Sequence, residues 1–441
     1  MTKEILRNSA PLAISLFAIM SFNLVDSLFL AHISKEKLAA ISLILPLTVV
    51  FGGFNFGMSA AVSSIVSRYN GAKDFNGINT VIWISLALNF MISLVLILLV
   101  SYLSQYIASF LNVPKDALVD FYDYLSIWKW AIPFIGIPVL LNSSLKALGR
   151  TYSPAIIIIL TSVINLILDY LFIIKFETFT TNAMTSAALA TLLARVFMSV
   201  TLVFYSIKIR SLNFSRLLNR SYHFIEIVRM SVPNIIIGLM VPAITTYTTS
   251  YIGRFGIEVV AHFGAIARIE SVLAILGLAL TSGSGPILGK FFGEGNEKKI
   301  MVLKSTLKKF LVGSFLFLTI TSLISSNYLH SLFFDKSSSN FILYLLIMNI
   351  YLFSRNLFAL ECTHRNSIGK PRKSLNYNIA GSFIYLITLK YIDYLNYDPI
   401  LSVYYAMLFT NLCLLFGIYV VSNIKFKDRE LSALKIRIKK D

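Results

Sequence analysis

Two aspartates, Asp26 and Asp169, have the clearest capacity for chemistry in this sequence, because each lies inside a long apolar run. A carboxylate within a membrane costs about 2.5–3.5 kcal/mol on insertion scales, so it is expected to face protein or a watery cavity. Asp26 follows Pro11 by 15 residues, and Asp169 follows Pro154 by 15. At about 1.5 Å per residue, two helices that start at the same face carry these acids to a similar depth. The spacing predicts that Asp26 and Asp169 share one cavity.

Two further polar residues are expected beside these acids. Asn165 lies four residues before Asp169, on the same helical face, and Thr191 reaches a similar depth on a helix of opposite direction. Two close carboxylates in a low dielectric favour the protonated form of at least one of them, which makes a proton acceptor. The same oxygen-rich cluster could instead hold a sodium ion. The remaining alternative is that both acids only satisfy local polar contacts at the outer interface.

A second set of charges lies in the other half of the chain. Arg268 and Glu270 share one apolar run, and Arg355 and Glu361 share another. Buried opposite charges usually pair, so these four residues are predicted to form structural ion pairs. The alternative makes Glu270 a second coupling or substrate-binding acid. Arg195 either pairs with an acid of the first half or extends to the interface.

The composition is typical of a polytopic membrane protein. The 441 residues are 56% hydrophobic and 14% charged, and the mean hydropathy is +0.75. Two cysteines and five scattered histidines give no disulfide, zinc or catalytic pattern, so neither an enzyme nor a cofactor is expected. The first residues lack the pattern of a signal peptide, so the first span is expected to stay in the mature protein. The net charge of +18 is assigned to cytoplasmic loops, not to nucleic-acid binding.

Twelve apolar runs predict an all-α protein with twelve transmembrane helices. The runs cover about 9–33, 38–66, 79–103, 121–147, 153–174, 183–207, 226–252, 258–288, 305–326, 340–363, 374–392 and 399–422. Most of the 39 Lys and Arg residues fall in segments that share one side when the N-terminus is cytoplasmic. This asymmetry predicts a multi-pass protein of the cell inner (cytoplasmic) membrane with both termini in the cytoplasm.

The sequence also repeats itself at an offset of 222 positions. The offset aligns Ser9 with Ser231, Pro11 with Pro233, Glu36 with Glu258, Ala39 with Ala261, Arg68 with Lys290 and Gly71 with Gly293. Two homologous six-helix lobes explain the repeat better than chance similarity. The predicted organisation is a first lobe at 1–208, a cytoplasmic linker at 209–225, a second lobe at 226–424 and a basic tail at 425–441.

Several segments resemble the multidrug and toxin extrusion (MATE) transporters. The matching segments are NLVDSLFLAHISKEKLAAISLILPL, GMSAAVSSIVSRYNGAKD, NSSLKALGR, INLILDYLFI, AALAT and FGAIARIESVLAILGLALTSGSGPILGKFFGEGN. The resemblance implies an antiporter that expels small organic, often cationic, compounds in exchange for protons or sodium ions. Carried across by position, it implies cation coupling by Asp26 and Asp169 with Asn165 and Thr191, and helix bending at Pro11.

Two positions depart from the pattern of the family. Phe22 replaces a tyrosine that some members carry, and Val139 replaces an asparagine, with Asn142 one turn further on. Phe22 and Asn142 are candidates for lining the substrate cavity, and Glu270 is a third candidate from the second half of the chain.

The predicted function is cation-coupled export by alternating access. The protein is expected to be a monomer, and its expected partners are the lipid bilayer and the exported compound. The alternative within the same architecture is a flippase of lipid-linked polysaccharide or peptidoglycan precursors. A channel is disfavoured, because duplicated lobes suggest rocking around a central site.

Overall fold

The computed structural model describes most of the chain. The described backbone covers residues 1–33, 35–111, 113–175, 183–209, 211–212, 220–333, 341–395 and 397–424, and the side chains of 21–43 and a few others lie outside the description. The predicted basic tail at 425–441 lies outside the described residues.

Every regular element of the described residues is helical. The α-helices are α1 (Thr2–Ile33), α2 (Lys35–Ala72), α3 (Phe75–Phe110), α4 (Leu118–Trp128), α5 (Ile132–Ala147), α6 (Tyr152–Asp169), α7 (Ala183–Lys208), α8 (Arg220–Gly253), α9 (Ile257–Gly293), α10 (Glu297–Ile324), α11 (Ser326–Phe333), α12 (Phe341–Ser367), α13 (Pro371–Tyr394) and α14 (Pro399–Ile424). Two short 3₁₀ helices, η1 (Lys115–Ala117) and η2 (Lys129–Ala131), flank α4, and a π-helical segment, η3 (Tyr170–Lys175), follows α6.

The twelve predicted spans correspond to these helices. The fourth span is α4, η2 and α5 in succession, the fifth is α6 with η3, and α11 is a short addition after α10. Among the described residues, ten segments are long and apolar enough to cross a membrane, and α1 and α13 occupy the other two positions. The prediction of an all-α protein with twelve transmembrane helices is confirmed.

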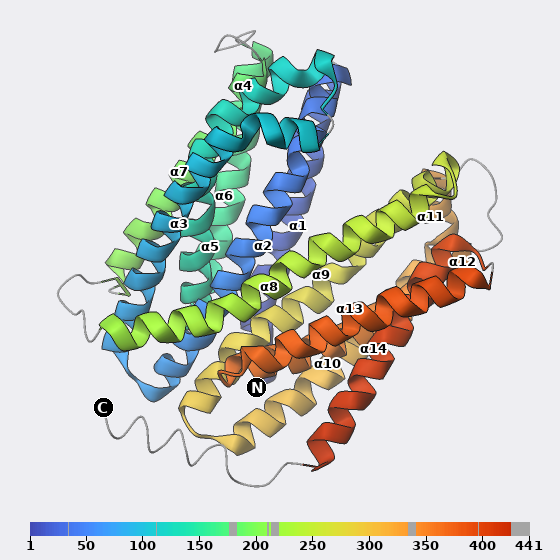
Figure 1. The fold of residues 1–441 in the computed structure, drawn as a ribbon. Coiled ribbons are helices and arrows are strands. Elements are labelled where there is room, and N and C mark those ends of the chain that lie inside the picture. The colour runs from blue at the N-terminus through green and yellow to red at the C-terminus, as the bar shows by residue number, and fades with distance from the viewer. Residues whose placement is uncertain are drawn as a thin grey trace. The chain divides into compact units, whose positions relative to one another are not determined.

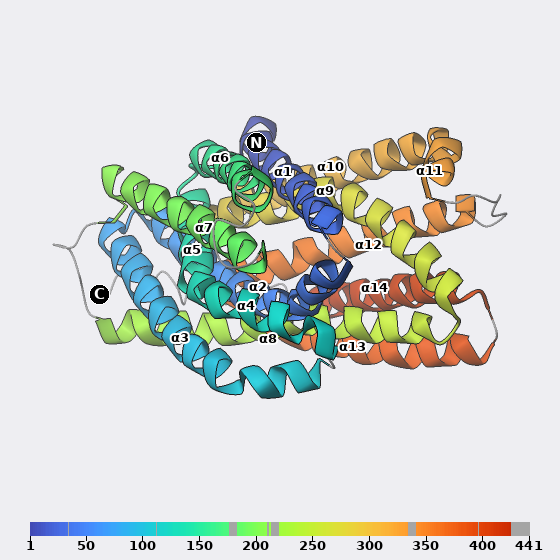
Figure 2. The same cartoon turned by 90° about the horizontal axis from the view of Figure 1, so that it is seen from above.

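The chain divides into two compact units, which we describe separately. The Ala10–Pro242 unit holds α2 to α7 with most of α1 and most of α8. Within it, α5 packs against α2, α3 and α7, and α6 packs along α7. Figure 1 and Figure 2 show α3, α5, α6 and α7 as one bundle. Its core forms two clusters, one around Ile65 and Leu141 and the other around Phe121 and Trp128.

The second unit joins Met1–Ser9 to Ala243–Asp441. In this unit α12 packs against α9, α10 and α14, and α13 packs on α14. One core cluster surrounds Tyr404 and Leu345, and the other surrounds Leu288 and Leu307.

The first helix of each sequence repeat begins in the core of the other repeat. Ile5 of α1 is fully buried in the cluster around Leu288, and Ile227 of α8 is fully buried in the cluster around Ile65. These two isoleucines are 222 positions apart. The compact units therefore differ from the predicted lobes at 1–208 and 226–424, because Ile5 of α1 and Ile227 of α8 bury their apolar side chains in the neighbouring core.

The repeat is also visible in the turns that precede α3 and α10. Lys73 and Gly295, at the same offset, both adopt left-handed backbone angles, with φ of 60° and 67°. The next residues, Asp74 and Asn296, cap the following helices, and their side chains accept backbone N–H bonds of 2.8 Å and 3.0 Å.

Candidate functional site

The predicted acid Asp169 lies at the end of α6 and is buried, with an exposure of 5%. The side-chain Nδ2 of Asn165, one turn earlier, donates a 3.0 Å hydrogen bond to Asp169 Oδ2. The pairing follows from the helix itself, since residues four apart lie on one face. The structure therefore brings together these two predicted site residues in an otherwise apolar span.

The helix changes type directly after this acid. Asp169 is the last α-helical residue, and Tyr170 begins the π-helical segment η3. A π-helical turn is rare and occurs mostly at functional sites, because the extra residue interrupts the regular hydrogen-bond ladder. The carboxylate thus lies at a helix irregularity, where backbone groups can serve as additional polar ligands.

Helix α7 carries Thr191 and packs against both α6 and η3. The Thr191 side chain is half-buried, and Arg195, one turn further along α7, is exposed. These contacts between helices place Thr191 on the element that covers the Asp169 segment.

The first predicted acid, Asp26, lies in α1, as does Phe22. The side chains of both residues lie outside the described part of the structure. Whether Asp26 and Asp169 share a cavity therefore remains a prediction from the sequence.

Pro11 is a buried residue in the interior of α1. The boundary between the compact units falls between Ser9 and Ala10, next to this proline, and the boundary in α8 falls directly after Pro242. A proline removes one helical hydrogen bond and so makes bending easier. Both helices that run from one unit into the other therefore do so beside a proline.

Glu270 of α9 forms an ion pair with Arg355 of α12, with 3.5 Å between Oε1 and Nη1. Tyr404 of α14 donates a 2.9 Å hydrogen bond to the other carboxylate oxygen of Glu270. The side chain of Glu270 is 20% exposed, and Tyr404 is almost fully buried. The cluster links three helices of one unit, which fits the structural role expected for Glu270 and Arg355.

The other two predicted pair members lie elsewhere. Glu361 pairs with Lys304 of α10, whose Nζ is 3.3 Å from both carboxylate oxygens. Arg268 is exposed on α9. The sequence reasoning missed Lys304 and Tyr404 as partners, because neighbours from other helices leave no mark on local spacing.

Asn142, the cavity candidate of α5, is half-buried, and its Oδ1 has no hydrogen-bond partner among the described residues. A second amide cluster was not expected. Asn89 Nδ2 donates a 3.1 Å hydrogen bond to Asn55 Oδ1, both residues are buried, and the close approach of Asn89 leaves no space for a side chain at Gly136. Asparagines inside apolar runs were the available sequence signal for this cluster.

The family model MatE matches the chain twice, over residues 11–171 and 233–392. These two matches begin 222 positions apart, which is the offset of the internal repeat. The duplicated match supports two homologous halves.

Several known proteins are similar over most of their length. An FAD transporter of Shewanella oneidensis is 27% identical over 405 residues, which cover 89% of this chain and 88% of the relative. The multidrug export protein MepA of Staphylococcus aureus is 21% identical over 309 residues, covering 69% of this chain and 68% of its own.

Solved structures share the fold. A mutant of the Vibrio cholerae MATE transporter VcmN superposes with a TM-score of 0.89 at 22% identity, covering 97% of this chain and 98% of the other. A MOP superfamily transporter from Pyrococcus furiosus gives a TM-score of 0.84 at 20% identity, covering 96% and 97%. With the family model matched in both halves, the chain belongs to the MatE family of multidrug and toxin extrusion transporters and is a membrane transporter, not an enzyme.

Proposed function

We propose that this transporter is an antiporter that exports small organic compounds in exchange for protons or sodium ions, and that Asp169 and Asp26 bind the coupling ion. The observation that carries the proposal is the buried carboxylate of Asp169, held by Asn165 at the start of a π-helical segment. An acid at this position is costly to insert and is therefore expected to have a functional role. No other cofactor is needed.

The same residues can serve either ion. Protonation removes the charge of one carboxylate, while sodium binding satisfies it with oxygen atoms from Asp169, Asn165 and Thr191. In both cases, ion binding changes the attraction between this site and a cationic substrate. The membrane potential adds about 2.3 kcal/mol per translocated charge per 100 mV.

We propose that bending of α1 near Pro11 couples ion binding to alternating access. The residues before Pro11 pack with the second unit and those after it with the first, so α1 connects the two. A change in the packing of α1 around Asp26 would therefore alter the contacts of α1 with both units.

Two substrate classes deserve testing. The expected class is an organic cation, and the relatives named as a multidrug export protein and a probable multidrug resistance protein make a drug-like compound a reasonable choice. The second class is a flavin nucleotide, because the relative named as an FAD transporter aligns over 89% of this chain. The flippase alternative is not favoured, since the relatives reported above are named as an FAD transporter and a multidrug export protein.

The test uses purified protein in liposomes. Efflux of ethidium and of FAD is measured under an imposed pH gradient and, separately, under a sodium gradient. Asp169→Asn is expected to reduce gradient-driven efflux to background, while Asp116→Asn, an exposed acid in η1, keeps the parent rate. Equal efflux by the parent and Asp169→Asn would contradict the assignment of Asp169.

We further propose that the protein is a monomer in the cell inner (cytoplasmic) membrane with both termini in the cytoplasm. The orientation rests on the distribution of Lys and Arg between the connections.

A further inference from the structure

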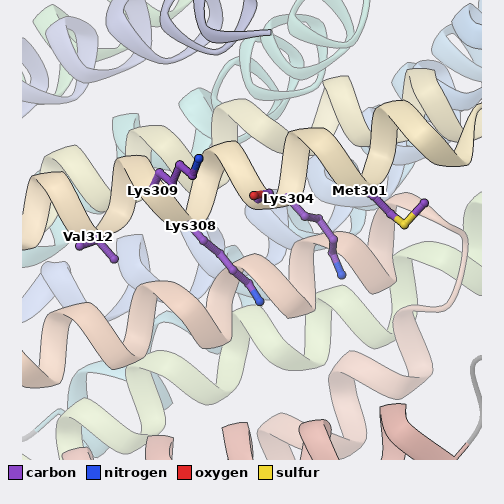
Figure 3. A pocket seen from close by; sticks show the side chains of 6 residues that line it. Met301, Lys304, Lys308, Lys309 and Val312 are labelled. Carbon is purple, nitrogen blue, oxygen red and sulfur yellow. The ribbon is translucent and has the colours of Figure 1, made fainter.

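Three lysines line a groove along α10. The groove has a volume of about 640 Å³ and is lined by Met301, Lys304, Ser305, Lys308, Lys309 and Val312. Figure 3 shows Lys304 and Lys308 extending to the same side of the helix, with their amino groups leaning toward the Met301 end. That end follows the cap at Asn296 and is the cytoplasmic end in the predicted orientation.

The charges at this groove do not balance. Lys304 is neutralised by Glu361, with 3.3 Å between Nζ and Oε2, but Lys308 and Lys309 are exposed and have no ion pair among the described residues. Arg365 of α12 adds another positive charge close enough to act on Lys304. It is 9% exposed, and its Nε has no hydrogen-bond partner within the described part of the chain. The groove therefore offers the positive charge of Lys308 and Lys309 to an anion.

An apolar stripe continues from the lysines along α10 and winds gradually around the helix, because each step of four residues turns by about 40° beyond one full turn. Every fourth residue after Lys308 is an exposed apolar side chain, and the stripe consists of Val312, Leu316, Ile320 and Ile324. Twelve residues of helix rise about 18 Å, which is close to the thickness of one leaflet of hydrocarbon, about 15 Å. The lysines lie at the depth of the lipid headgroups, and the apolar stripe is about as long as an acyl chain in one leaflet. Together they offer contacts to both parts of a phospholipid.

The corresponding helix of the first half has no such feature. α3 occupies the equivalent position, and its whole length from Phe75 to Phe110 contains no Lys or Arg. At the offset of 222, Ile82, Leu86 and Ala87 replace the three lysines. The fold of this helix does not require the lysines, so their presence in α10 calls for a separate reason.

We propose that this groove binds an anionic phospholipid of the cytoplasmic leaflet. The phosphodiester lies against Lys308, with Lys309 and Arg365 adding to the positive field, and an acyl chain runs along the stripe from Val312 to Ile324. Basic pockets between membrane helices on the cytoplasmic side are suited to anionic headgroups, and each Lys near such a surface contributes about fivefold in affinity.

Native mass spectrometry of the full-length protein tests the proposal. The parent is expected to retain phosphatidylglycerol in preference to phosphatidylcholine of the same chains. In Lys308→Gln/Lys309→Gln this preference should fall by about tenfold or more. The control Lys298→Gln/Lys373→Gln removes two exposed cytoplasmic-side lysines from other positions and should stay within about twofold of the parent.

Two further arms complete the test. Lys308→Arg/Lys309→Arg keeps both charges and should retain the preference for phosphatidylglycerol. If the double Gln variant cannot be purified in folded form, Lys308→Gln alone is measured, and its preference should be about fivefold lower than that of the parent. Millimolar inorganic phosphate should not displace the lipid, because it lacks the acyl chain. An unchanged preference in both Gln variants, equal retention of the two lipids by the parent, or displacement by phosphate would each overturn the proposal.

Discussion

Arg68 at the end of α2 and Glu226 near the start of α8 form an ion pair, with 3.1 Å between Nη2 and Oε1. Tyr69 adds a 2.6 Å hydrogen bond to the other oxygen of Glu226. The repeat reproduces the pair at an offset of 222, where Lys290 of α9 lies 4.0 Å from Glu4 of α1. Each pair joins a helix of one repeat to a helix of the other, within a single compact unit.

The two pairs are expected to differ in strength. The side chains of Arg68 and Glu226 are 12% and 16% exposed, whereas Lys290 is 41% exposed. Glu226→Gln should lower the free energy of unfolding by about 1.5–3 kcal/mol, because a mostly buried guanidinium loses its counter-charge. Glu4→Gln should cost less than about 1 kcal/mol, because solvent screens the longer pair. Chemical unfolding in detergent measures both, and equal losses would contradict the ranking.

Close packing of α2 against α8 gives a second prediction. A Cβ atom at Gly57 would collide with the backbone of α8 at Ile235, while one at Gly52 would meet nothing within 4 Å. Gly57→Ala is expected to lower the free energy of unfolding by about 1–3 kcal/mol, because neither helix backbone can yield easily. Gly52→Ala, the matched control, should be neutral or stabilise by up to about 1 kcal/mol. The unfolding midpoints of the two variants are compared. A Gly57→Ala variant as stable as the parent would argue against the close contact between Gly57 and Ile235.

Substitutions in the cluster around Glu270 test whether this residue has a structural role or a role in transport. Glu270→Gln removes the counter-charge of Arg355, whose side chain is 38% exposed. We expect a loss of about 1–3 kcal/mol in the free energy of unfolding, less than for a fully buried pair. Tyr404→Phe should cost about 1 kcal/mol by deleting one hydrogen bond. A Glu270→Gln protein as stable as the parent, but without efflux in liposomes, would instead assign Glu270 to coupling or substrate binding.

The two acids of the first half are predicted to act as one unit. Asp26→Asn and Asp169→Asn should each abolish gradient-driven efflux, and the double variant should be no worse than either single one. Each variant should remain folded, because Asn keeps the size of the side chain and removes a costly intramembrane charge. Efflux rates at matched protein amounts provide the measurement. Unchanged pH-dependent efflux in both single variants would move attention to Glu270 and Glu361.

The predicted orientation can be checked by labelling. In a background with Cys362 and Cys413 replaced by Ser, Lys298→Cys should react with an impermeant thiol reagent only from the cytoplasm. Lys115→Cys should react only from outside. Both positions are exposed, so access is not limited by burial. Labelling of Lys298→Cys from the outside would reverse the topology.

The sequence by itself determined the class of protein and the positions of its helices. Apolar runs of sufficient length must become helices in a bilayer, since the backbone has no other way to satisfy its polar groups there. The Asn165 and Asp169 contact also follows from the chain alone, because positions four apart in a helix are neighbours. The offset of 222 aligned Arg68 with Lys290 and, extended to the first residues, aligns Glu4 with Glu226.

Only the tertiary structure decided which distant residues meet. Glu270 pairs with Arg355 rather than with Arg268 of its own helix, and Glu361 pairs with Lys304. Burial of Ile5 and Ile227 in neighbouring cores likewise depends on how helices pack, which the periodicity of one helix does not encode. Side-chain direction and helix crossing fix such contacts, and both arise from the packing of many residues at once.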